Sequence, residues 1–152
     1  MASTKEKITA TALALFAQRG YDGVSVRDIC KQVGIKESSL YYHFPSKHAI
    51  LTTLLSHFEN RAAEGMAQLE QALGDQQGPW GQVSYRMVCQ AFFEGYLMDP
   101  FCNQVLRLLQ MEQFHNPDLG EIYERWMFRV PLAFQGRMFT ALVDLGLLHP
   151  AT

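Results

Sequence analysis

Cysteine is scarce in this sequence, with three residues in a chain of 152. Cys30, Cys89 and Cys102 form an odd, scattered set without C-x-x-C spacing, which argues against a disulfide framework and against a zinc site. Cys89 and Cys102 can be interpreted as redox sensors or as small buried hydrophobes, and the composition favours the second interpretation.

Long apolar runs are also absent. A helix that spans a bilayer needs about 18 or more consecutive apolar residues, and no such run occurs. The first residues, MASTKEKI, lack the apolar core of a signal peptide. Because 48% of the residues are nevertheless hydrophobic, the chain can bury a core, and we expect a folded cytoplasmic protein with no membrane segment.

The net charge of −2 is small but unevenly distributed. Seven basic and five acidic side chains precede residue 61, so this part carries +2 and the remainder carries −4. A positive N-terminal region can neutralise phosphates while an acidic remainder stays away from a duplex. This modest asymmetry is compatible with a nucleic-acid partner and does not establish one.

Two short helices joined by a tight turn are predicted between residues 24 and 47. Ser25 and Asp28 have the spacing of a capping box and start the first helix, which ends at Gly34, where a turn with positive φ costs little. The second helix runs from about Lys36 to His43, with Leu40 facing inward, and Pro45 ends it. This arrangement is a helix-turn-helix, whose second helix can enter the major groove of DNA.

The outer face of the second helix is rich in hydrogen-bond donors, and its sequence GIKESSLYYHFPSK resembles the signature of the tetracycline-repressor (TetR) family of bacterial transcriptional regulators. The resemblance extends upstream and covers about the first third of the chain. It departs from the family pattern at Glu37, Ser38 and His48. The upstream positions that agree are Ile8, Ala12, Leu15, Phe16, Gly20 and Tyr21.

Helical periodicity predicts an all-α fold. A first helix over about 4–19 should brace the helix-turn-helix, and Ser46 should cap a rod of roughly 28 residues, about 40 Å long, that ends near Leu73. Beyond a loop at 74–79, three aromatic-rich helical segments follow, and Pro131 should kink the last of them. We therefore expect a DNA-binding domain at 1–47, joined by the rod to a helical effector-binding and dimerisation domain at 48–152.

The resemblance implies a set of DNA-binding residues, with Arg27 included. Glu37 can accept a hydrogen bond from a cytosine amino group, or can simply balance the charges of Lys36 and Arg27. The residues expected at phosphates are Ser25, Ser39, Tyr42, His43 and Lys47. Those expected at base edges are Lys36, Glu37, Ser38 and Tyr41.

The aromatic and methionine content of the second half can form a solid core or line an apolar cavity. Spacing alone favours the core, whereas the family resemblance implies an effector pocket between these helices. The candidate lining residues are Met87, Phe92, Tyr96, Phe101, Leu106, Met127 and Phe134.

The resemblance further implies a homodimeric repressor that binds a palindromic operator and is released by a small apolar or aromatic effector. Family members continue into two further helices that form the dimer interface, so this chain is expected to be truncated or to pair through other surfaces. An enzyme using His43, His48 and His57 is disfavoured by their spacing, and we expect no catalytic residue, metal or cofactor. A non-specific or architectural DNA-binding protein is the alternative.

Overall fold

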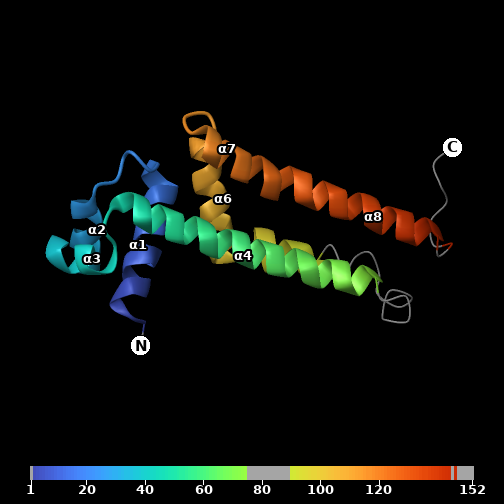
Figure 1. The fold of residues 1–152 in the computed structure, drawn as a ribbon, viewed down its shortest axis with the longest axis horizontal. Helices are drawn as coiled ribbons and strands as arrows, with labels where there is room; N and C mark the ends of the chain where they lie inside the picture. Colours follow the sequence, from blue (N-terminus) through green and yellow to red (C-terminus); the bar gives the residue numbers. More distant parts are fainter. Residues whose placement is uncertain (1, 75–89, 145, 147–152) are drawn as a thin grey trace.

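The computed structural model describes residues 2–74, 90–144 and 146, and its elements in these ranges are all helical. The predicted all-α fold, with a helix-turn-helix followed by a helical domain, is confirmed (Figure 1). Met87, Cys89 and the predicted loop after residue 74 lie outside the described residues. The elements are α1 (Thr4–Arg19), α2 (Val26–Val33), α3 (Glu37–His43), α4 (Lys47–Gly74), η2 (Phe93–Leu97), α6 (Pro100–Glu112), α7 (Pro117–Glu124), η3 (Arg125–Arg129) and α8 (Val130–Asp144).

The first three helices form a head at one end of the elongated molecule (left in Figure 1). α1 begins with a capping box between Ser3 and Glu6 and ends at Gly20, where φ is 76°. Ile8 and Phe16 of α1 are fully buried, together with Ile29 of α2. These contacts give the head a hydrophobic centre that holds the two short helices in place.

α4 runs from the head along the length of the molecule (Figure 1). The Ser46 hydroxyl accepts a hydrogen bond from the Ala49 N–H at 3.1 Å, as the predicted cap requires. The helix has 28 residues and is therefore about 42 Å long. Its Ile50 is buried, and Phe58 contacts the rings of Tyr96 and Trp126. One helix thus contributes both to the packing of the head and to that of the second domain.

α6 crosses between the head and the remainder of the chain, packing against both α1 and α4. The Asp99 carboxylate caps its first turn by accepting from the N–H groups of Phe101 and Cys102 at 3.1 and 2.9 Å. Pro100 fits at the first helical position because its missing N–H would have had no helical acceptor. Arg61 of α4 pairs with the same carboxylate at 2.6 Å, so the start of α6 is held against α4.

The last helical stretch contains Pro131 and is distorted just before it, as the sequence predicts. A proline inside an α-helix removes one hydrogen bond and its ring clashes with the carbonyl four residues earlier. Here the chain widens into the π-helical turn η3 immediately before α8, which relieves this crowding without ending the helix.

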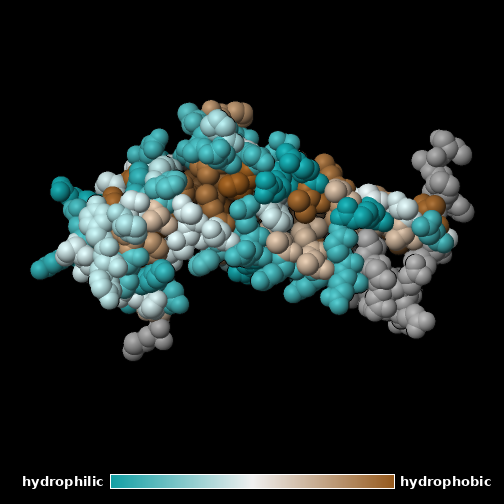
Figure 2. Space-filling view, viewed as in Figure 1, coloured by the Kyte–Doolittle hydropathy of each residue, from teal (hydrophilic) through white to brown (hydrophobic). Residues whose placement is uncertain are grey.

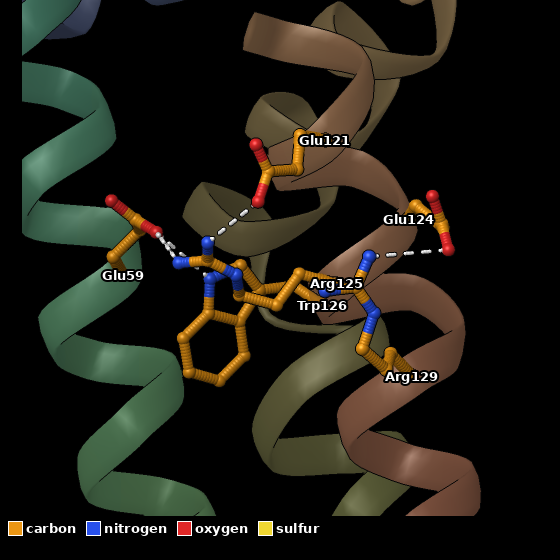
Figure 3. Close-up of polar contacts among 6 residues, drawn as sticks. All are labelled: Glu59, Glu121, Glu124, Arg125, Trp126 and Arg129. Atoms are coloured by element: carbon orange, nitrogen blue, oxygen red, sulfur yellow. Dashed lines mark hydrogen bonds and ion pairs between the residues drawn. The ribbon is translucent and has the colours of Figure 1, made fainter.

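η3 is tied to α4 by a small polar cluster (Figure 3). The Glu59 carboxylate of α4 accepts from the Trp126 indole N–H at 3.2 Å and lies 3.5 Å from the Arg125 guanidinium. Arg125 also pairs with Glu121 at 3.0 Å. Figure 2 shows hydrophobic residues gathered between α4 and α8 in the middle of the molecule, while the end formed by the head is mostly hydrophilic.

Candidate nucleic-acid interface

The turn that precedes α2 is built as the sequence predicts. The Ser25 hydroxyl accepts from the Asp28 N–H at 3.1 Å, and the Asp28 carboxylate accepts from the Ser25 N–H at 2.9 Å and from its hydroxyl at 2.6 Å. These hydrogen bonds from Ser25 lower the pKa of Asp28. Gly34 follows α2 in the left-handed region, with φ at 80°, and lets the chain turn into α3.

α3 has one buried side and one exposed side. Leu40 and Phe44 are 0% and 2% exposed and anchor the helix to the head. On the opposite side Tyr42 is 86% exposed and Tyr41 is 48% exposed. Lys36, Ser38 and Ser39 are exposed as well, whereas Glu37 and His43 are half-buried. A row of donors therefore lies on the surface of a helix that its apolar residues hold firmly.

Two of the predicted DNA-binding residues are paired with each other. The Arg27 guanidinium lies 3.2 Å from the Glu37 carboxylate, and their side chains are 85% and 44% exposed. The sequence left two interpretations of Glu37, base reading or local charge balance, and this ion pair is the local charge balance. An exposed ion pair of this kind contributes at most about 1 kcal/mol, so a nearby nucleic acid can reorganise it.

Lys47 lies beside the head rather than projecting freely from it. Its ammonium donates to the backbone carbonyls of Tyr21 and Val24, both at 2.9 Å, and sits 4.1 Å from the centre of the Tyr21 ring. An ammonium has three donors, so one remains for a phosphate. The family resemblance implies a phosphate contact for Lys47, which stays a prediction, and the sequence gave no sign of these backbone contacts.

Glu112 of α6 is a further residue of this region that sequence reasoning did not assign to it. Its carboxylate accepts from the Tyr21 N–H at 2.8 Å, in a contact between residues 91 positions apart. No local pattern could have indicated a pairing over that separation.

A cavity of about 230 Å³ lies between α4 and the residues around η2. Of the predicted lining residues, Phe92 and Tyr96 line it. Phe101 and Met127 pack against the main core, and Leu106 and Phe134 are buried. The Tyr96 hydroxyl donates to the Trp126 carbonyl at 2.9 Å, and burial raises the pKa of Tyr96. The α4 side of the cavity, which sequence reasoning missed, is formed by Arg61, Ala62, Gly65, Met66, Gln68 and Leu69.

The described residues contain no cluster of three or more histidine, cysteine or acidic side chains that could hold a metal ion. Within the same ranges, no helix combines the length and the apolar character needed to cross a membrane.

Residues 8–54 match the profile of the family described as bacterial regulatory proteins, tetR family. The biofilm operon icaADBC HTH-type negative transcriptional regulator IcaR of Staphylococcus aureus is 54% identical over 46 residues, which are 30% of this chain and 25% of that protein. The uncharacterized HTH-type transcriptional regulator YuxN of Bacillus subtilis is 33% identical over 94 residues, or 61% of this chain and 31% of that protein.

The fold has solved counterparts too. The crystal structure of a TetR-family transcriptional regulator from Marinobacter aquaeolei VT8 has a TM-score of 0.68 and 23% sequence identity, and the match covers 99% of this chain and 70% of that chain. At this identity the likeness concerns the fold alone. The two sequence matches span a quarter to a third of the length of the curated relatives.

Proposed function

We propose that the chain is a TetR-family transcriptional regulator that reads DNA with α3, since its residues 8–54 match the model of that family. The observation that carries this proposal is the two-sided character of α3. Leu40 and Phe44 fix the helix from within, and Tyr41 and Tyr42 stand on its exposed side. A helix held in this way fits the major groove, whose width of about 12 Å admits one α-helix.

We assign base reading to Lys36, Glu37, Ser38 and Tyr41, and phosphate binding to Ser39, Tyr42 and His43. The exposed Lys36 and Ser38 lie where the helix begins, and the N-terminal residues of a recognition helix commonly contact base edges. Ser39, Tyr42 and His43 lie further along, where hydroxyl and imidazole donors can bind the backbone. Ser25, Arg27 and Lys47 extend the phosphate contacts onto α2 and α4.

We further propose that two copies pair, so that two α3 helices enter successive major grooves about 34 Å apart on a palindromic operator. The support for pairing is on α8 and the turn before it. Phe128 and Leu132 lie four residues apart on one face and are 48% and 60% exposed. Exposed apolar side chains that share one helix face mark interaction surfaces, and a second copy of the chain is the proposed partner here.

Regulation by a small effector is proposed for the cavity between α4 and η2. Its volume of about 230 Å³ is below the 300–1,000 Å³ or so of drug-sized ligand sites, so it suits a small apolar or aromatic molecule. Its wall includes α4, which continues into the head, and filling the cavity would therefore tilt the head. Repression is the proposed direction because the S. aureus relative is a negative regulator.

Selection from a random duplex library tests the proposal. The full chain is incubated with the library at 150 mM salt, and the bound duplexes are sequenced over several rounds. We expect a palindromic motif, protection of two half-sites in a footprint, and a dimer by light scattering. A chain that binds selected and scrambled duplexes equally well would instead be an architectural DNA-binding protein.

A further inference from the structure

The connection between α1 and α2 is held from two sides at Tyr21. Gly20 has φ of 76° and ψ of 164°, which takes the chain away from α1, and the next N–H, that of Tyr21, donates to the Glu112 carboxylate at 2.8 Å. The Tyr21 carbonyl accepts from Lys47 at 2.9 Å. One residue of the head is therefore bound to the end of α6 through its N–H and to the start of α4 through its C=O.

The fit around Glu112 is close. A Cβ atom on Gly20 would lie 2.9 Å from the Glu112 carboxylate oxygen, so a side chain at this position would displace the carboxylate from where it now lies. Glu112 is also the last residue of α6, where the helix dipole disfavours negative charge. A charge-assisted hydrogen bond to a partly buried N–H offsets this unfavourable position.

The opposite end of α6 is joined to the cavity wall through one ion pair. Asp99 caps α6 and pairs with Arg61, and Arg61 lines the cavity wall. The 13 residues of α6 span about 20 Å. Carboxylates at its two ends thus fix α6 to the cavity wall at one end and to the head at the other.

We propose that Glu112 is a positioning residue for DNA binding, which sets the orientation of the head relative to α6 through the Tyr21 N–H. The inference rests on the proposed function and adds to it the residue that transmits movement of α6 to α3. The amide oxygen of glutamine can accept from the same N–H without the charge, so Glu112→Gln keeps the hydrogen bond and Glu112→Ala loses it.

The test compares Glu112→Ala and Glu112→Gln in the full chain, with Glu64→Gln as the control that removes an acid from an exposed position of α4. The probes are a duplex selected by the wild-type chain and a scrambled duplex of the same composition. Glu112→Ala should bind the selected duplex about tenfold more weakly, within the range of about 5- to 150-fold typical of coupled sites. Its affinity for the scrambled duplex should not change, because the phosphate-binding side chains remain. Glu112→Gln and Glu64→Gln should bind both duplexes as the wild type does.

A second measurement separates positioning from general stability. Amide exchange at Tyr21, followed by NMR, should accelerate at least about tenfold in Glu112→Ala and stay slow in Glu112→Gln, while exchange in the centre of α4 is unchanged. If Glu112→Ala does not fold, Glu112→Asp replaces it, since the retracted carboxylate no longer reaches Tyr21, and the same loss is expected.

Two outcomes overturn the inference, and they can be told apart. If the wild type selects a duplex and Glu112→Ala binds it with wild-type affinity, the inference fails and the proposed function stands. If the wild type selects no duplex, the proposed function fails and the inference fails with it.

Discussion

Leu40 and Tyr42 lie two residues apart on α3 and face opposite ways. Replacing each of them by alanine in turn therefore distinguishes the part of α3 that stabilises the fold from the part that contacts DNA. Leu40 is completely buried in the head, and a buried Leu→Ala substitution costs about 2–5 kcal/mol. At about 3 kcal/mol, Leu40→Ala should lower Tm by about 6–12 °C in a chain of this size. Its folded fraction should still bind DNA, because the exposed face of α3 is unchanged.

Tyr42→Ala should behave in the opposite way. Because Tyr42 is largely exposed, its truncation should alter the free energy of unfolding by no more than about 0.5 kcal/mol. Losing a hydrogen bond to a phosphate, worth about 1.5–3 kcal/mol, should weaken DNA binding about 10- to 150-fold. Tyr42→Phe removes only the hydroxyl and is the matched variant that isolates this hydrogen bond.

Both variants are measured by urea denaturation followed by circular dichroism, and by fluorescence anisotropy with the selected duplex at fixed salt. Each variant should change a different measurement: Leu40→Ala should lower the stability, and Tyr42→Ala should lower the affinity for DNA. If Tyr42→Ala unfolded the protein and Leu40→Ala were neutral, the buried and exposed faces of α3 would be reversed and the DNA-reading assignment would have to be abandoned.

Three further predictions concern the cap, the phosphate contact and the buried thiol. Ser25→Ala should lower the free energy of unfolding by about 1 kcal/mol in urea denaturation, and no change would mean that the cap does not stabilise α2. Lys47→Ala should weaken binding to selected and scrambled duplexes alike, reduce the salt slope by about one, and destabilise the head, because two backbone carbonyls lose their donor. An unchanged salt slope would leave Lys47 a purely structural role. Burial raises the pKa of Cys102 to about 11, so its thiolate is scarce at pH 8. After iodoacetamide treatment of the folded chain, mass spectrometry should find Cys102 unmodified at pH 8. The modified fraction should rise as the pH approaches 11. Rapid modification at pH 8 would contradict this prediction and support a redox role for Cys102.

The helix-turn-helix could be predicted from the sequence because its signals are local. Ser25 and Asp28 cap each other three residues apart, Gly34 supplies the positive φ of the turn, and Pro45 prevents α3 from continuing. None of these effects depends on a distant part of the chain. Helix ends that are fixed by their own neighbours were therefore placed to within one or two residues.

The contacts that join the head to the remainder of the chain could not be predicted in this way. Glu112 and Tyr21 are 91 positions apart, and nothing in either neighbourhood indicates the other. The same holds for the cavity, because the apolar periodicity of α4 predicts a packed stripe and does not distinguish residues that pack from residues that line a space. The α4 residues Ala62, Met66 and Leu69 were missed for that reason, whereas Phe92 and Tyr96 were among the predicted lining residues.

The packing also decides how a change at the cavity could reach α3. The sequence predicts a domain boundary at residue 47, and the buried core continues across that position, from Ile8 in α1 through Phe58 in α4 to Leu109 in α6. Close-packed interiors are nearly incompressible, so a shift of α6 or α4 displaces the residues of α1 that pack against them. α3 is anchored to this same core by Leu40 and would move together with the head. Its hydrogen-bonding face would therefore change position relative to a second copy without changing its own shape.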